Sequence, residues 1–259
     1  MKPTSIILCL LLSGAVFAQT PRTGIFERST DIGNPAIKGE VLYNASNQSY
    51  SLKGSGYNIW FERDEFSYAF NQIEGDFILT ANFRFEGAGG DAHRKTGWMV
   101  RASEDESSPH ISAVLHGDGL TAMQWRDFSG GEMKDPDNQS FAKDSGYEII
   151  QLERAGEVFY MRAALPGKPF EEIGSYQMAN MPDRVLAGLF ICSHNPEVTE
   201  QSTAWNVRID KPVGDDYNAQ RDGAVGCRLE TMNVFDGKRM VIWEKQGRFE
   251  GPNWMPDGK

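Results

Sequence analysis

The sequence predicts an all-β fold, and three observations carry the prediction. Between residues 36 and 211, about a dozen short runs of β-forming residues follow one another. The segments between these runs are short and rich in Gly, Asp and Asn, which is the composition of turns. No segment of this region carries the apolar repeat of a long helix. Short strands at this spacing are typical of an antiparallel β-sandwich or barrel.

The individual strands are predicted from β-rich composition and from alternation between apolar and polar residues. In chain order they are 40–43, 49–53, 66–73, 77–85, 97–102, 110–116, 120–126, 147–154, 158–164, 174–178, 185–192 and 203–209. The run 120–126 shows the alternation between the two faces of one strand. One face carries Leu120, Ala122, Gln124 and Arg126, and the other carries Thr121, Met123 and Trp125.

Residues 1–18 have the pattern of a signal peptide. Lys2 supplies the positive charge, residues 6–12 form the apolar stretch, and Ala18 ends a small-residue cleavage site. A lipid anchor on Cys9 is disfavoured because Leu8 stands where such a site needs a small residue. We therefore expect cleavage near Ala18 and a periplasmic or extracellular protein.

The charge and the apolar runs of the chain bear on whether it binds nucleic acid or spans a membrane, and its cysteines bear on whether it forms a disulfide. The chain carries a formal charge of -10, which becomes -11 once Lys2 is removed, and it has no basic block. An acidic chain of this kind is a poor candidate for nucleic-acid binding. No apolar run beyond the N-terminus is long enough to span a membrane. Cys192 and Cys227 remain after cleavage. They either form a disulfide with each other or stay as two free thiols, and the sequence does not decide between these states. The oligomeric state is not predicted.

The C-terminal part differs from the rest. Residues 212–224 are polar and contain Pro and Gly, which predicts a linker. Residues 225–259 predict two strands, Asp-Gly turns and the start of a third strand. Residues 228–259, and above all "PNWMPDGK" at 252–259, resemble the repeat of TolB-type WD40-like β-propellers. That resemblance implies an incomplete propeller blade, a truncated form of a longer protein, and a segment that packs poorly or borrows an edge of the sandwich.

Residues 22–211 resemble a concanavalin-like, laminin-G-like jelly roll of the family found in enolase regulators and beside β-xylosidase domains. The matching motifs are "DIGNP" at 31–35, "GSGYNIW" at 54–60, "GWMVRAS" at 97–103 and the stretch 108–127. The resemblance implies a β-sandwich, which hosts many different functions.

Polar residues that alternate along neighbouring predicted strands indicate a binding groove on a curved sheet. The candidates for ligand contacts are Arg101, His110, Gln124, Arg126 and Glu153, with Ser112 and Gln151 beside them, and Trp60 and Trp98 (or Trp125) for stacking on a sugar ring. The alternative is structural: Arg101 and Arg126 form ion pairs with Glu153 or Asp127, and the tryptophans belong to the core.

Catalytic and metal motifs are weak. The E-x-D-x-E arrangement of concanavalin-like hydrolases is absent, and the acidic run 103–107 alternates between faces. There is no G-x-S-x-G and no zinc spacing. Residues 135–138, with Asp135, Asp137 and Asn138, are a candidate calcium loop without the EF-hand pattern; otherwise we expect no cofactor.

These observations favour an exported, non-catalytic recognition module that binds carbohydrate or an envelope protein. Two alternatives stay open at this point: a TolB-like periplasmic scaffold associated with biopolymer transport, and an enzyme of the glycoside hydrolase type.

Overall fold

The computed structural model describes residues 23–214, 217–218, 220 and 226–246. The expected signal peptide and the signature at 252–259 lie outside these residues. Within the described part the protein is all-β, and its strands pair in antiparallel fashion, as predicted. No helix among these residues could cross a lipid bilayer.

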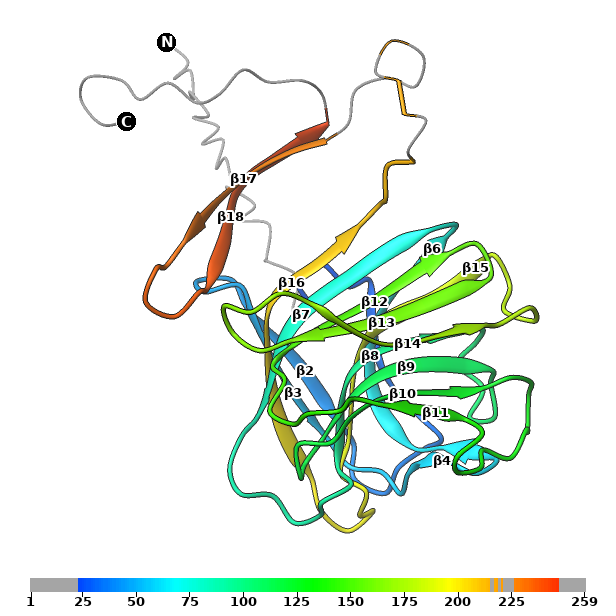
Figure 1. Ribbon diagram of the computed structural model, residues 1–259. Helices are drawn as coiled ribbons and strands as arrows, with labels where there is room; N and C mark the ends of the chain where they lie inside the picture. The colour runs from blue at the N-terminus through cyan, green and yellow to red at the C-terminus, as the bar shows by residue number, and fades with distance from the viewer. Residues whose placement is uncertain (1–22, 215–216, 219, 221–225, 247–259) are drawn as a thin grey trace, which may run out of the picture.

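Two seven-stranded sheets form a sandwich (Figure 1). Sheet A has the order β1 (Arg28–Ile32), β6 (Phe66–Glu74), β15 (Arg184–Cys192), β8 (Lys95–Arg101), β9 (His110–His116), β10 (Thr121–Arg126) and β11 (Gln139–Phe141). Sheet B has the order β14 (Glu171–Gln177), β13 (Val158–Ala164), β12 (Ile149–Ala155), β7 (Phe77–Phe85), β16 (Glu200–Asp210), β3 (Ser49–Gly54) and β2 (Glu40–Asn44). Strands far apart in sequence are neighbours in both sheets, as in a jelly roll.

Two short hairpins complete the described strands. β4 (Ile59–Trp60) pairs with β5 (Arg63–Asp64), and β17 (Gly226–Met232) pairs with β18 (Arg239–Gln246). We call residues 226–246 the C-terminal hairpin. It joins neither large sheet and lies beside sheet B (Figure 1).

The main core lies between the sheets and is built from alternate residues of both. Trp98 of sheet A and Phe83 of sheet B meet there edge to face, with ring centroids 6.2 Å apart. Aromatic pairs of this geometry stabilise a core beyond the area that they bury.

The outer faces of the two sheets differ. Every residue of β8, β9 and β10 is buried, so chain segments cover the outer face of sheet A as well as its inner face. A second apolar cluster lies there, where Ile59 of β4 packs with Phe66, Met99 and Phe190. β12 instead alternates between buried and half-buried residues, so the outer face of sheet B is accessible. That accessible face carries the candidate site.

Candidate functional site

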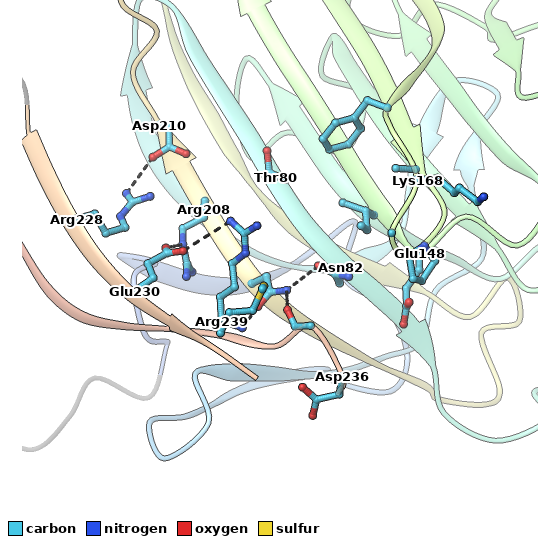
Figure 2. Close-up of a pocket in the computed structure, with 18 residues that line it drawn as sticks. Thr80, Asn82, Glu148, Lys168, Arg208, Asp210, Arg228, Glu230, Asp236 and Arg239 are labelled. Carbon is cyan, nitrogen blue, oxygen red and sulfur yellow. Dashed lines mark hydrogen bonds and ion pairs between the residues drawn. The ribbon is translucent and has the colours of Figure 1, made fainter. Parts of the chain in front are cut away.

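A cleft of about 720 Å³ lies between the outer face of sheet B and the C-terminal hairpin (Figure 2). Its floor is formed by β7, β12 and β16, one rim by the turn between β13 and β14, and the opposite wall by the hairpin. The lining residues are mostly polar or charged: Thr80, Asn82, Glu148, Lys168, Asn206, Arg208, Asp210, Arg228, Glu230, Asp236 and Arg239, together with Ile149, Ala164, Pro166, Gly167, Phe170, Met232 and Gly237.

Hydrogen bonds between side chains fix the floor of the cleft. Asn206 Nδ2 donates to Asn82 Oδ1 at 3.0 Å, and Gln151 Nε2 donates to Thr80 Oγ1 at 3.1 Å. Arg162 continues this row by donating to Gln151 Oε1 at 3.1 Å. Side chains held in this way present donors and acceptors in set positions, which favours specific polar recognition.

A local irregularity aims Asn206 at the hairpin. The pairing of β16 with β7 shifts register between Trp205 and Arg208, and Asn206 lies inside the shift with a φ of 53°. Asparagine adopts this left-handed conformation more readily than most residues. Bulges of this kind commonly redirect a side chain next to a functional site.

Amide side chains of the sandwich hold the hairpin in place. The backbone N–H of Val241 donates to Gln48 Oε1 at 2.8 Å, and Gln48 Nε2 donates to the carbonyl of Val241 at 2.9 Å. The backbone N–H of Arg239 donates to Asn206 Oδ1 at 2.7 Å. The hairpin therefore docks through side chains, and it does not extend a sheet of the sandwich.

Replacing Gln48 by alanine is expected to loosen the hairpin, because Val241 loses the partners of both its amide and its carbonyl. Two lost hydrogen bonds correspond to about 1–3 kcal/mol of local stability. Hydrogen exchange of the Val241 amide should accelerate accordingly, while exchange in β8 stays unchanged. Gln201→Ala, which removes an exposed bond to Ser51 on the same sheet, is the control. If the Val241 amide exchanged equally slowly in the unaltered protein, in Gln48→Ala and in Gln201→Ala, this docking of the hairpin would be contradicted.

Ion pairs organise the hairpin wall of the cleft. Arg208 Nε lies 2.7 Å from Glu230 Oε1, and Arg228 Nη2 lies 2.9 Å from Asp210 Oδ1 and 3.0 Å from Glu244 Oε1. Glu148 lies on the opposite side (Figure 2). Burial raises the pKa of the Glu148 carboxyl, and the charge of Arg84 opposes this rise.

The groove predicted on Arg101, His110, Gln124 and Arg126 has a different character in the structure. These four side chains do share the outer face of sheet A, on β8, β9 and β10, but all four are buried. The segment around β4 and β5 covers Arg101, His110 and Arg126, and Gln124 donates a hydrogen bond to Gln139 of β11 at 3.1 Å. Arg101, His110 and Arg126 are each 0–1% exposed. The predicted groove is therefore filled by the protein's own chain.

Asp64 of β5 occupies the centre of this covered face. Its carboxylate receives hydrogen bonds from Arg126 Nη2 at 2.7 Å and Nη1 at 2.8 Å, and from Arg101 Nη1 at 3.3 Å. His110 Nδ1 lies 3.6 Å from the same carboxylate. Burial acts to raise the pKa of Asp64, but His110, Arg126 and Arg101 outweigh it and hold this pKa below its usual value.

The structural alternative was right that Arg101 and Arg126 form ion pairs, but it named the wrong partners. Glu153 lies on the outer face of sheet B and pairs with Arg162. Asp127 accepts a hydrogen bond from the Tyr176 hydroxyl at 2.8 Å. The predicted contact residues therefore belong to two opposite faces of the sandwich and cannot bind one small ligand together.

The tryptophans are placed mainly as core residues. Trp98 has no exposed surface, and Trp125, 5% exposed, stacks on Tyr176 with ring centroids 4.1 Å apart. Trp60 is half-buried on β4, over sheet A. Trp98 is consequently not available to a sugar ring, because it lies between the two sheets.

Within the described residues, the cysteines form no disulfide, and no group of side chains is arranged as a metal site. Cys192 is buried, Cys227 is half-buried, and both are free thiols. No three His, Cys, Asp or Glu side chains of the described ranges are arranged to hold a metal ion. In the predicted calcium loop, Asp135 accepts a hydrogen bond from Gln139 Nε2 and Asn138 Oδ1 accepts one from the backbone of Lys134.

Comparisons with known proteins describe the fold. No protein-family model matches the sequence, and no curated protein matches it either. A functionally unknown protein from Saccharomyces cerevisiae is similar in structure, with 16% identity and a TM-score of 0.54 over 72% of this chain and 97% of that one. These figures show a shared fold and leave the function open.

Two further neighbours are jelly-roll proteins with lower scores. Lectin II from Ulex europaeus is 10% identical, with a TM-score of 0.46 over 73% of this chain and all of the lectin. The GH43 protein BlXynB from Bacillus licheniformis is 9% identical, with a TM-score of 0.45, and the match spans only 33% of its length. The predicted antiparallel β-sandwich is confirmed by the two large sheets of the structure, whereas the propeller resemblance of residues 228–259 stays a prediction.

Proposed function

We propose that this protein is an exported, non-catalytic recognition module that binds a saccharide in the cleft between sheet B and the C-terminal hairpin. The observation that carries the proposal is the fixed polar floor of an open cleft. Sugar hydroxyls both donate and accept hydrogen bonds, and amide and guanidinium groups offer complementary donors and acceptors. Asn82 and Arg208 line the cleft and carry such groups, and Asn206 holds Asn82 in position through a hydrogen bond.

An aromatic side chain at the rim supports a saccharide over other polar ligands. Phe170 lines the cleft and is 42% exposed. An exposed ring with an apolar face suits the C–H side of a pyranose, while the polar floor meets its hydroxyls. The residue pattern of a signal peptide at 1–18 supports export to the periplasm or the cell exterior.

Screening the full chain on an array of oligosaccharides, followed by calorimetry, tests the proposal. Phe170→Ala should weaken binding of a captured saccharide by about 2- to 10-fold, the range expected for one aromatic contact. Phe128→Ala is the matched control, because Phe128 is also exposed but does not line the cleft. Binding that is absent, or that both variants weaken equally, would rule out this cleft as the site.

The same assay separates a hydrolase from a binding module. Release of reducing ends from the captured saccharide, abolished by Glu148→Gln, would replace the proposed function by glycoside hydrolysis, which needs a protonated carboxyl beside a second carboxylate.

A second candidate is contact with an envelope protein, as in the TolB-like alternative. Exposed apolar side chains on the C-terminal hairpin favour it: Leu229, Met232, Val234, Phe235 and Ile242. Surfaces of this kind commonly mark protein contacts. Cross-linking in cells that loses a protein adduct when Phe235 is replaced by Ser would support this candidate.

A further inference from the structure

The charges that line the cleft are balanced in number but not in position. Four cationic side chains, Arg208, Arg228, Arg239 and Lys168, face four acidic ones, Glu148, Asp210, Glu230 and Asp236. A ligand meets the charges near it, and not the sum over the whole cleft, because interactions between exposed charges are screened within about 10 Å. The distribution along the walls therefore decides which ligand is favoured.

At one end of the hairpin wall, two arginines share one carboxylate, and Asp236 on the nearby turn forms no ion pair with either arginine. Arg208 and Arg239 share the single carboxylate of Glu230, at 2.7 Å and 3.8 Å (Figure 2). Arg239 is 57% exposed, and its longer contact leaves its guanidinium group open to another anion. Farther along the wall, carboxylates outnumber arginines, because Arg228 alone binds both Asp210 and Glu244.

A buried donor at the same end still needs an acceptor. Arg208 Nε binds Glu230, and Arg208 Nη1 donates to the carbonyl of Val207 at 2.8 Å. Arg208 Nη2 is buried and has no hydrogen-bond partner among the described residues, and the same is true of Arg228 Nε farther along the wall. Leaving such a donor unpaired is unfavourable, and more so for a charged group. A ligand oxygen would satisfy this donor only by displacing the atoms that cover it, because the donor has almost no accessible surface in this structure.

The opposite side of the cleft adds a further cation. Lys168, in the turn between β13 and β14, lies across the cleft from Arg239 (Figure 2) and is exposed. Among the described residues Lys168 forms no ion pair. Glu148 lines the same cleft, but among the described residues no ion pair joins it to Lys168. An anion in the middle of the cleft would therefore meet cations on both sides.

We infer that the saccharide bound in this cleft is acidic, with a ring carboxylate that lies between the guanidinium groups of Arg208 and Arg239 and the ammonium group of Lys168. This inference rests on the proposed function. A carboxylate, as in a uronic acid, is favoured over a sulfate ester because its two coplanar oxygens match the fork of a guanidinium group.

Calorimetry with matched ligands tests the inference. The probes are oligouronates and their methyl esters, which have the same size and configuration but carry no charge. The acid is expected to bind at least about 10-fold more tightly than its ester, since hydrogen bonds between charged groups are stronger than those between neutral ones. Arg239→Gln should remove most of this difference, and Lys168→Gln should remove a smaller part.

Arg184→Gln is the control, because Arg184 is an exposed arginine in an ion pair with Glu74 and does not line the cleft. It should leave the preference for the acid intact. Equal affinities for acid and ester would overturn the inference while the proposed function stands. Tighter binding of sulfated oligosaccharides would overturn the assignment to a carboxylate. Failure of every saccharide to bind would instead overturn the proposed function itself.

Discussion

Replacing Asp64 by alanine is expected to lower the free energy of unfolding by about 3–5 kcal/mol. The carboxylate of Asp64 is fully buried and is the shared partner of Arg101 and Arg126, whose side chains are also buried. Removing it leaves two guanidinium groups in the interior without their counterion. The carbonyls of Ser103, Gly131 and Phe61 still accept hydrogen bonds from these arginines, but they supply no net charge.

Urea unfolding followed by tryptophan fluorescence measures this effect. Asp64→Asn keeps the size of the side chain and part of its hydrogen bonding, so its loss of stability should lie between those of the unaltered protein and Asp64→Ala. Glu74→Gln, which breaks an exposed ion pair with Arg184, should change stability by less than about 1 kcal/mol. If Asp64→Ala behaved like Glu74→Gln, the buried cluster would not hold β4 and β5 against sheet A.

Lowering the pH from 6.5 towards 3 is expected to destabilise the protein steadily. Burial lowers the pKa of His110 to about 3, against a partial opposing effect of Asp64. Burial and the charge of Lys95 lower the pKa of His116 to about 3 as well. In the unfolded chain both imidazoles bind a proton near pH 6.5. Because the unfolded state then binds more protons, the free energy of unfolding falls with pH, by about 1.4 kcal/mol per pH unit for each histidine.

The stability contributed by these two neutral histidines is fully present above about pH 6.5 and is lost as the pH approaches 3. Urea titrations at intervals through this range measure the slope. His116→Gln removes one of the two groups, so its slope should be shallower by about 1.4 kcal/mol per pH unit. His93→Gln, which removes a neighbouring imidazole from the exposed side of the same cluster of rings, is the control. Parallel curves for His116→Gln and the unaltered protein would contradict the explanation.

Alternation along single strands was sufficient to predict the fold and part of the arrangement of side chains. It placed Arg101, His110, Gln124 and Arg126 on one face because each pairs in register with a neighbour on the next strand. What covers that face was not predictable from these strands. Asp64 stands among the charged residues of "FERDEF", where nothing distinguishes a buried carboxylate from an exposed one.

The cleft was missed for a related reason. Its walls come from residues between Thr80 and Arg239, and they meet only because the C-terminal hairpin folds back over sheet B. One signal was present in the sequence. Asn206 and Arg208 alternate along the predicted strand 203–209, and Asp210 continues the alternation just after it. On the hairpin, Arg228 and Glu230 offer opposite charges at matching spacing. Such complementarity indicates that two segments pack together, but only after both are known to be strands.

The amide of Gln48 has a consequence for the behaviour of the protein at high concentration. A two-stranded hairpin has open edges, and an open edge is a template on which a strand of another molecule can add. On β18, Gln48 occupies the backbone groups of Val241, and Asn206 occupies the N–H of Arg239. These side chains take the place of a neighbouring strand at two residues of β18, which hinders the addition of a strand from another molecule there. Gln48 and Asn206 therefore also protect this edge from aggregation.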